Sequence, residues 1–519
     1  MNAETSSPGT DTDVTASADV ETPWRRLDPR MLVVGPAAGL VRLLPVIVVF
    51  LVTGQGDAMR LWLPLGVVVL LVLGGGVRWR TTRYRITDER VELHSGWLRR
   101  QRRSVPRDRI RTVDLTAKLL HRVFGLSVVH VGAASGGVTE NQGLALDAVS
   151  TGEADRLRHE LLGRTRTPVP HTPVAPAPTP VEELARLHWS WLRFAPLTFS
   201  SVAGVGAIGA AVFNLFGDLG VDPRDIDAVD DAAARLAGAP LWVGVLVVGL
   251  VLLVVAVAGA MLLFAERWYG YRLTREPSPE GAGTLRVRRG LLTRRSLSVA
   301  ESRMRGAEVV EPLLLRAGRG AQTRALSTGL SRDAQGGALL PPAPHTEAHR
   351  VASAALREHP AEITLAALRP HPRAALQRRL TRALGPAALL VAGAFLLGHA
   401  VPPVSWLGPA SLVLLPAAAL VALDRFRNLG HQLTARYLVT RRGSIQRRTV
   451  ALQRAGVIGW TFRQSVFQRR AGVATVEAIT AAGVGGYEVL DVAASDGVAL
   501  ADAAVPGLLT PILRPGSVP

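Results

Sequence analysis

The sequence contains no cysteine and a single lysine, Lys118. The lack of cysteine excludes disulfide bonds, thiolate nucleophiles and cysteine-ligated metal sites. Because lysine is nearly absent, the net charge of +19 is carried almost entirely by arginine, a bias that matches the codons of a high-GC bacterium. Aromatic residues make up only 5% of the chain and are not interleaved with the arginines, so nucleic-acid binding is not indicated.

The N-terminal segment lacks the features of a signal peptide. Residues Met1 to Glu21 are rich in Ser, Thr and Asp, and they contain neither a basic start nor an apolar run. This composition predicts a disordered tail.

Long apolar runs are abundant. Hydrophobic residues make up 48% of the chain, and its mean hydropathy is +0.23. A helix that crosses a bilayer needs about 20 apolar residues. Five windows of this kind are clear, at 61–77, 196–216, 239–265, 384–400 and 403–423. The sequence therefore predicts a protein of the cell inner membrane.

A sixth span is predicted at 31–53, and Arg42 lies near its middle. An unpaired charge there would cost about 2.5 to 3.5 kcal/mol on insertion scales. Either residues 31–41 lie at the interface and a short span begins at Leu43, or the span is tilted and Arg42 snorkels or pairs. We favour the first interpretation, which leaves about six spans in three hairpins.

The connectors between the spans predict the orientation. The connector at 217–238 holds six aspartates against two arginines, whereas arginines follow the spans that end at Val77 and Leu423. Under the positive-inside rule, this connector is external and both termini and all large segments are cytoplasmic.

The segments that follow the three hairpins share a series of landmarks. Tyr84, Tyr271 and Tyr437 each open a strand-like run that ends in Thr, and a glycine with basic neighbours follows at the expected turn. A "Leu-Leu-x-Arg" motif ends at Arg122 and Arg316, and a looser version ends at Arg469. Each segment closes with a helical stretch, at 150–162, 346–357 and 495–504. Short strands followed by one helix are the order of a pleckstrin-homology (PH) barrel.

The hairpins repeat as well. A basic motif precedes each of the three, beginning at Arg26, Arg186 and Arg369. The unit of basic motif, helical hairpin and cytoplasmic domain is therefore used three times. In the first domain we expect Leu119, Leu120, Phe124 and Leu126 in the interior.

The first copy resembles the bacterial PH-domain membrane proteins of the YdbS/YdbT type. It carries the family signature as Tyr84 to Thr87, Gly96, Arg109 to Arg111 and Leu119 to Leu126. The resemblance extends over nearly the whole chain and implies a PH-like fold. It implies no established catalytic chemistry.

The predicted fold is a membrane protein of α plus β structure, with three transmembrane hairpins alternating with three PH-like β-barrel domains that each end in a helix. The predicted boundaries are a disordered tail at 1–25, the first hairpin at 26–77, domain one at 78–163, a Pro-rich linker at 164–184, the second hairpin with its acidic external loop at 185–265, domain two at 266–358, the third hairpin at 369–423 and domain three at 424–510.

Motifs that suggest an enzyme have simpler explanations. The glycines at 204–209 match a dinucleotide fingerprint, but they lie inside an apolar span and more simply allow helices to pack closely. The segment from His345 to His349 lacks the spacing of a zinc site, and we interpret it as a helix cap with solvated histidines. We therefore predict no enzyme, no metal site and no cofactor.

Arginine clusters are the candidate binding residues. They occur at 99–100, 102–103, 294–295 and 441–442, and each charge near an anionic membrane contributes about 1 kcal/mol. The residues we predict to contact the membrane surface or a partner are Arg99, Arg100, Arg102, Arg103, Arg109, Arg111 and Arg122.

The predicted function is a membrane scaffold without enzymatic activity. Its cytoplasmic domains would bind membrane lipids, and protein partners or further copies of the same family in a homo-oligomer or hetero-oligomer. The alternative is a transporter or lipid-handling protein with a path between the hairpins, which would gain weight if Arg42 were buried at membrane depth.

Overall fold

The computed structural model describes residues 23–40, 43, 59–87, 89–97, 100–107, 110–133, 144–162, 181–198, 240–277, 283–328 and 337–509, with five isolated positions between 206 and 238. Arg42 and most of the spans expected at 31–53 and 196–216 lie outside these residues. So do the glycine motif at 204–209, apart from Gly206, the Pro-rich linker and most of the acidic connector.

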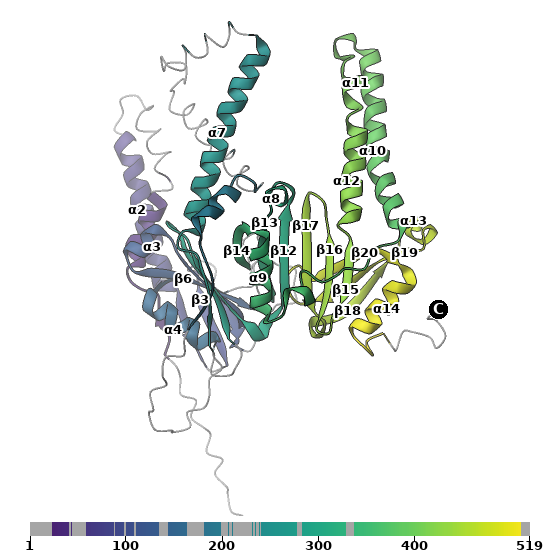
Figure 1. Cartoon of the computed structure of the whole chain (residues 1–519). Helices are drawn as coiled ribbons and strands as arrows, with labels where there is room; N and C mark the ends of the chain where they lie inside the picture. Colours follow the sequence, from purple (N-terminus) through teal and green to yellow (C-terminus); the bar gives the residue numbers. More distant parts are fainter. Residues whose placement is uncertain are drawn as a thin grey trace, which may run out of the picture.

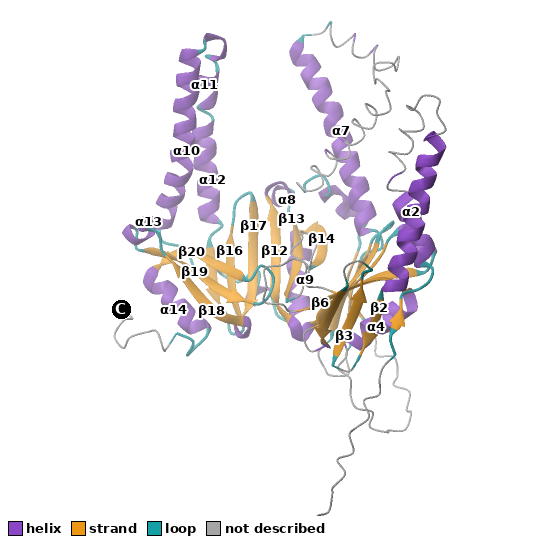
Figure 2. Ribbon diagram, turned by 180° about the vertical axis from the view of Figure 1, so that it is seen from behind, coloured by secondary structure: helices purple, strands orange, loops and turns teal. Residues whose placement is uncertain are grey.

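Three described helical segments are long and apolar enough to cross a membrane: Trp242–Trp268 within α7 (Leu241–Trp268), α10 (Arg373–Ala400), and Pro402–Arg427. The last contains η6 (Pro402–Val404), α11 (Leu407–Ser411) and α12 (Leu414–Arg427). Side chains such as Leu389 and Leu396 are more than 70% exposed, so these helices need an apolar surrounding. Together with α2 (Met59–Thr81), they project from one side of the sheets (Figures 1 and 2).

Repeat one contains seven strands and two helices besides its membrane helices. In chain order these are β1 (Arg25–Arg26), β2 (Arg83–Ile86), β3 (Arg90–Ser95), β4 (Gln101–Pro106), β5 (Ile110–Ala117), α3 (Leu119–Val123), β6 (Leu126–Ala133), β7 (Leu144–Ser150) and α4 (Thr151–Leu162).

Repeat two has the same order of elements, with short 3-10 turns added. They are β8 (Glu182–Arg186), η2 (Trp189–Phe194), β9 (Arg272–Glu276), β10 (Thr284–Arg289), β11 (Arg294–Ala300), η4 (Glu301–Arg303), β12 (Met304–Pro312), α8 (Leu313–Ala317), β13 (Gly320–Ser327), β14 (Ala338–Pro344), α9 (His345–Leu356) and η5 (Pro360–Glu362).

Repeat three follows the same plan after its hairpin. Its elements are β15 (Gly430–Leu433), β16 (Tyr437–Arg442), β17 (Gln446–Gln453), η7 (Arg454–Gly456), β18 (Val457–Arg463), α13 (Val466–Arg470), β19 (Val473–Thr480), β20 (Gly486–Ala493) and α14 (Ala494–Ala504). The second and third segments are thus β-rich like the first, as the repeat predicts.

Two details establish how the repeats correspond. The strands β5, β12 and β18 all begin nine residues before the short helix that follows them, and each has a register shift just after its first residue. The turn before β4, β11 and β17 begins in each case with a glycine in the left-handed region, at Gly96, Gly290 and Gly443, with φ of 102°, 107° and 102°. These glycines confirm the predicted turns.

The glycine alignment corrects the prediction for Tyr437. Tyr84 lies in β2 and Tyr271 immediately precedes β9, which are equivalent strands. Tyr437, however, begins β16, which is equivalent to β3 and β10 because it leads into the Gly443 turn. The matching strand of repeat three is β15, which has no tyrosine, so the similar letters around Tyr437 belong to the next strand.

The basic motifs before the hairpins have a structural role that the sequence did not predict. Arg26 pairs with Arg83, Arg186 with Arg272, and Arg369 forms an isolated bridge to His431. In each repeat, the chain therefore contributes a strand or a bridge to the sheet before it enters the hairpin and returns to the neighbouring strand.

The sheets do not form three separate closed barrels, which corrects that part of the predicted fold. We call β4, β11 and β17 the leading strands and β5, β12 and β18 the trailing strands of their repeats. Trailing β5 pairs with leading β11 to give a seven-stranded sheet, β7-β6-β5-β11-β10-β9-β8, and trailing β12 pairs with leading β17 to give a six-stranded sheet, β14-β13-β12-β17-β16-β15. The remaining sheets are β1-β2-β3-β4 and β18-β19-β20. Strands of neighbouring repeats therefore satisfy one another's hydrogen bonds.

Each repeat keeps a hydrophobic core between its own two groups of strands. In repeat one, Leu126 is fully buried, and Leu120 and Phe124 are partly buried against this core. Leu119 is 50% exposed, which corrects its predicted interior position. It begins the five-residue helix α3, in which no residue is fully buried.

Candidate functional site

The side of the sheets from which the membrane helices project carries two repeated apolar features. The glycine turns expose Trp97, Leu292 and Ile445, and the short helices α3, α8 and α13 expose Val123, Leu314 and Phe467, each by at least 50%. Figure 1 shows these three helices on the side of the sheets that faces the long helices. Large exposed apolar side chains in equivalent turns and short helices are typical of a surface that lies against another apolar phase.

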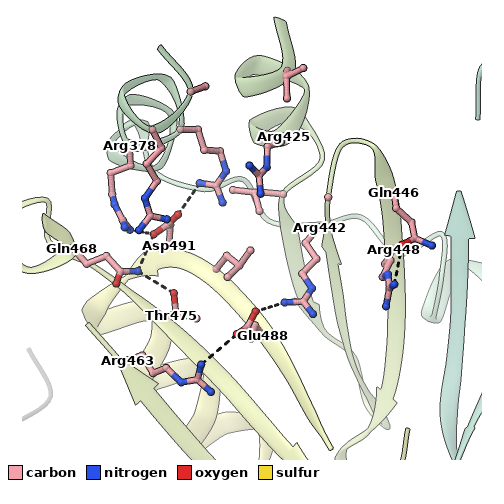
Figure 3. Close-up of a pocket in the computed structure, with 17 residues that line it drawn as sticks. Arg378, Arg425, Arg442, Gln446, Arg448, Arg463, Gln468, Thr475, Glu488 and Asp491 are labelled. Atoms are coloured by element: carbon pink, nitrogen blue, oxygen red, sulfur yellow. Dashed lines mark hydrogen bonds and ion pairs between the residues drawn. The ribbon is translucent and has the colours of Figure 1, made fainter. Parts of the chain in front are cut away.

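A cavity of about 590 Å³ lies where the third hairpin meets repeat three. Its walls come from α10, α12, the turn between β16 and β17, β18, α13 and the strands β19 and β20. Figure 3 shows side chains from these elements around it. The lining residues are spread over the chain from Arg378 to Asp491, so only the folded chain forms this cavity.

Arginines dominate the cavity lining. Two carboxylates, Glu488 and Asp491, are present against seven arginines, which are Arg378, Arg379, Arg382, Arg425, Arg442, Arg448 and Arg463. The lining therefore carries five more positive than negative charges. Such an excess around one cavity favours an anionic ligand.

Asp491 connects repeat three to the membrane helix α10. This residue is buried, and its backbone adopts the left-handed region with φ of 53°. Its carboxylate accepts hydrogen bonds from Arg378, from Arg379 Nη1 at 2.8 Å and from Gln468 Nε2 at 3.0 Å. The carboxylate therefore neutralises part of the positive charge on α10 and fixes the positions of Arg378 and Arg379.

Glu488 holds a second pair of arginines, Arg442 and Arg463, on the opposite wall. It accepts a hydrogen bond from Arg442, and Arg463 Nη1 lies 3.8 Å from its Oε1. Arg448 donates to Gln446 Oε1 at 2.9 Å.

Arg382 and Arg425 are the cavity arginines that protein groups do not hold. Both side chains are exposed, and within the described part of the chain neither has a hydrogen-bond or ion-pair partner. Arg382 comes from α10 and Arg425 from α12, so the two residues line the cavity from the two arms of the hairpin. They remain available to a ligand.

The arginines predicted from the sequence lie elsewhere. Arg100, Arg102 and Arg103 are exposed on or beside β4 in repeat one. Arg122 donates to the backbone carbonyl of Leu291 and lines a second cavity, of about 390 Å³, between repeats one and two. Arg99 and Arg109, and the side chain of Arg111, lie outside the described residues.

Most of the cavity lining was not predicted from the sequence. Of its arginine clusters, only the one at 441–442 contributes a lining residue, Arg442. A signal was present on α10, where Arg378 and Arg382 are four residues apart and therefore share a helix face just before the apolar stretch. Nothing in the sequence links that face to Arg425 or Arg463.

The segment from His345 to His349 also differs from its predicted form. Helix α9 begins at His345 without a side-chain cap, and His349 is buried rather than solvated. Its Nδ1 lies 2.6 Å from Thr364 Oγ1 and its Nε2 lies 2.9 Å from His345 Nε2. Burial and the neighbouring His345 lower the pKa of His349 to about 4. Among the described residues, no group of three or more His, Asp or Glu could hold a metal ion.

His349 predicts a loss of stability in mild acid. Because its folded-state pKa of about 4 lies below the ordinary value of 6.5, the unfolded chain takes up the proton first. The contribution is fully present above pH 6.5 and is lost as the pH falls towards 4. Between pH 7.5 and 5 we expect the free energy of unfolding in detergent to fall by about 2 kcal/mol from this residue. His349→Gln should flatten the dependence, whereas exposed His130→Gln should not. An unchanged slope in His349→Gln would contradict the assignment.

Comparison with known proteins supports the resemblance. The family model described as "Bacterial PH domain" matches residues 36–165 and 387–504, which lie in repeats one and three. The chain is 32% identical over 95 residues to a protein of Bacillus subtilis (strain 168) named "UPF0699 transmembrane protein YdbT". That match covers 18% of this chain and 19% of the relative, so it spans about a fifth of the relative's length. No solved structure matches the chain. Two matched regions, a transmembrane relative and a third copy of the same strand order support a bacterial PH-domain protein of the YdbT type.

Proposed function

We propose that this protein is a multi-pass membrane scaffold whose repeat-three cavity binds the headgroup of an anionic lipid. Six membrane helices in three hairpins would hold the repeats against the cytoplasmic leaflet, with both termini in the cytoplasm. Arginines in the last turns of α2 and α12 support this orientation. The exposed apolar turns and short helices would lie at the same interface.

The charge imbalance of the cavity carries the proposal. The lining has five more positive than negative charges, and Glu477 and Glu308 outside it pair with Arg463 and Arg448, which leaves an excess of three. Arg382 and Arg425 have no protein partner within the described residues. Guanidinium groups bind phosphate through charge-assisted hydrogen bonds. A phosphate group would therefore supply the missing negative charge.

The position of the cavity favours a lipid over a free phosphate compound. It lies at the end of the third hairpin, and the α10 arginines immediately precede the apolar part of that helix. Apolar Ala383, Val421 and Leu429 line the cavity beside the arginines. This combination fits a headgroup whose acyl chains continue along the hairpin.

The test measures lipid-dependent thermal stability of the full chain in mixed micelles. Phosphatidylglycerol should raise the midpoint of unfolding in a dose-dependent manner, and phosphatidylcholine should not. Arg382→Ala/Arg425→Ala removes two contacts of about 1 kcal/mol each, so the apparent affinity for phosphatidylglycerol should fall by about 30-fold.

The matched control is Arg373→Ala/Arg427→Ala. These exposed arginines occupy the same two helices but do not line the cavity, so the affinity should remain close to that of the unchanged protein. Equal stabilisation by both lipids, or equal losses in both double variants, would refute the proposal. Saturation by millimolar inorganic phosphate with no further effect of the lipid would show a soluble phosphate ligand instead.

The exposed arginines of repeat one and protein partners remain part of this proposed function. Arg100, Arg102 and Arg103 would add charge at the membrane surface or at a partner. The transporter alternative depends on the depth of Arg42, which lies outside the described residues.

A further inference from the structure

Both junctions between neighbouring repeats are built by the same two strand types. A trailing strand, β5 or β12, pairs antiparallel with the leading strand of the next repeat, β11 or β17. Six residue pairs form the first junction and seven form the second. This rule leaves one strand of each type without a neighbouring repeat. Within the described residues, leading strand β4 pairs only with β3, and trailing strand β18 pairs only with β19.

We propose that trailing strand β18 of one copy pairs with leading strand β4 of a second copy, so that the protein assembles head to tail. The contact would continue the interface that already occurs twice inside the chain. Arg463, the last residue of β18, also lines the lipid cavity, but the ladder is formed by backbone groups and does not depend on the ligand of that cavity.

Strand β18 has the form of a pairing edge. It has the register shift after its first residue that β5 and β12 also have. Its side chains Ile458 and Phe462 are 64% and 42% exposed. A seven-residue edge strand with exposed apolar side chains is open to pairing with another strand.

Strand β4 carries Arg102, Arg103 and Pro106, which are residues that often protect an edge. In this protein, arginine does not prevent pairing, because both leading strands that are paired contain two consecutive arginines. These are Arg294 and Arg295 in β11 and Arg447 and Arg448 in β17.

Pro106 lies beyond the segment that pairs. Its equivalents are Ala300 in β11 and Gln453 in β17. Pairing with the trailing strand ends one residue earlier in both, at Val299 and Leu452. The missing N–H of the proline therefore falls outside the expected ladder.

The internal registers fix the register between copies. Transferred to the free strands, they place Gly459 opposite Val105, Thr461 opposite Arg103, and Arg463 opposite Gln101 of the second copy. All three pairs are sterically ordinary for an antiparallel ladder.

The pair of Arg463 with Gln101 indicates that the edges of β18 and β4 are complementary. At the equivalent position, the internal junctions pair Thr116 with Arg295 and Val310 with Arg448, so the arginine is on the leading strand. In the free pair the arginine is on the trailing strand, as Arg463, and the leading strand has a glutamine. The exchange avoids two opposed arginines, which would be destabilising. A second copy of this chain therefore fits the edge.

The membrane permits this assembly. Across both internal junctions, the membrane helices stay on the same side of the sheets (Figure 1). Another step of the same kind would place the helices of the second copy in the same bilayer. Because different surfaces meet, the result is a ring or an open row.

The test uses disulfide formation in a chain that has no cysteine of its own. Side chains directly opposite each other in an antiparallel pair have Cβ atoms about 4.5 to 5.5 Å apart. Full-length Arg103→Cys/Thr461→Cys in lipid vesicles should form a ladder of covalent dimers and larger oligomers on mild oxidation. A mixture of the two single variants should form dimers only, since each chain then offers one reactive end.

Two matched variants control the geometry. In Arg102→Cys/Thr461→Cys, the β4 cysteine lies on the opposite face of the strand from residue 103. This variant should crosslink roughly fivefold less than Arg103→Cys/Thr461→Cys. Thr116→Cys/Arg295→Cys, at the first internal junction, should close within one chain. A ladder equal in both intermolecular variants, or no ladder while the internal pair closes, would overturn the proposal. So would crosslinking of Thr461→Cys alone, either to itself or, in native membranes, to a different protein.

Discussion

Asp491→Asn is expected to destabilise the full-length protein in neutral detergent by about 3 to 5 kcal/mol, the usual effect of removing one partner of a buried ion pair. The substitution keeps the size of the side chain, and asparagine tolerates the left-handed backbone at this position. It removes the negative charge that faces Arg378 and Arg379, whose side chains are about 10% exposed or less. Both guanidinium groups would then share a poorly solvated space without a counter-charge.

Thermal or denaturant unfolding measures this loss. Asp496→Asn is the control, because that aspartate is exposed in the first turn of α14 and should change stability by less than about 1 kcal/mol. Phosphatidylglycerol should reduce the Asp491→Asn defect, because a headgroup in the cavity would restore negative charge near the two arginines. Equal stability of the two variants in neutral detergent would mean that Asp491 does not hold α10 against repeat three.

The landmarks that survive in all three repeats were predictable from the sequence. Local conformation determines them: a glycine where the backbone enters the left-handed region, and a helix at the end of each repeat. Gly96 and Gly290 show this most clearly, since their turns have nearly the same φ of 102° and 107° despite different neighbours. The short helices α3, α8 and α13 were not predicted, although the "Leu-Leu-x-Arg" motif and its looser version lie on them. The alignment of similar sequence motifs was wrong at Tyr437, because the motif around this residue lies on a different strand of the repeat.

The sharing of sheets between repeats was not predictable in the same way. A strand's sequence records which of its faces is buried, but not which other strand satisfies its outer hydrogen bonds. β4 and β17 show this, because both are arginine-rich leading strands, yet only β17 has a neighbouring repeat among the described residues. For the same reason the predicted barrels are open sheets.

The candidate cavity was unpredictable for a related reason. Its arginines come from four separate parts of the chain, and their shared space arises only when α10 and α12 settle on repeat three. Sequence clusters identified Arg442 alone because charge density along the chain does not report charge density in space. The burial of His349 was unpredictable for the same reason. Its partner Thr364 lies beyond the end of α9, and the two meet only in the folded chain.

Glu311→Leu is expected to weaken the junction between repeats two and three by about 3 kcal/mol. Glu311 lies on trailing strand β12 and its side chain is 2% exposed. It accepts two hydrogen bonds from Arg447 of leading strand β17, at 2.7 Å and 2.6 Å. Leucine would leave the Arg447 guanidinium group at the junction without its carboxylate, and that unpaired charge is the main source of the loss.

The double variant Glu311→Leu/Arg447→Leu separates this ion pair from the strand pairing itself. With both charges removed, much of the stability should return, because backbone hydrogen bonds and apolar contacts remain between β12 and β17. Arg436→Ala is the control at the same junction: its partner Glu358 is 2.6 Å away, but Arg436 is 61% exposed, so the change should be below about 1 kcal/mol. Amide hydrogen exchange should show faster opening of β12 and β17 in Glu311→Leu, with the core of repeat one unaffected. If exchange rose equally in all three repeats, or if the double variant were as unstable as the single one, the charged pair would not be what stabilises this junction.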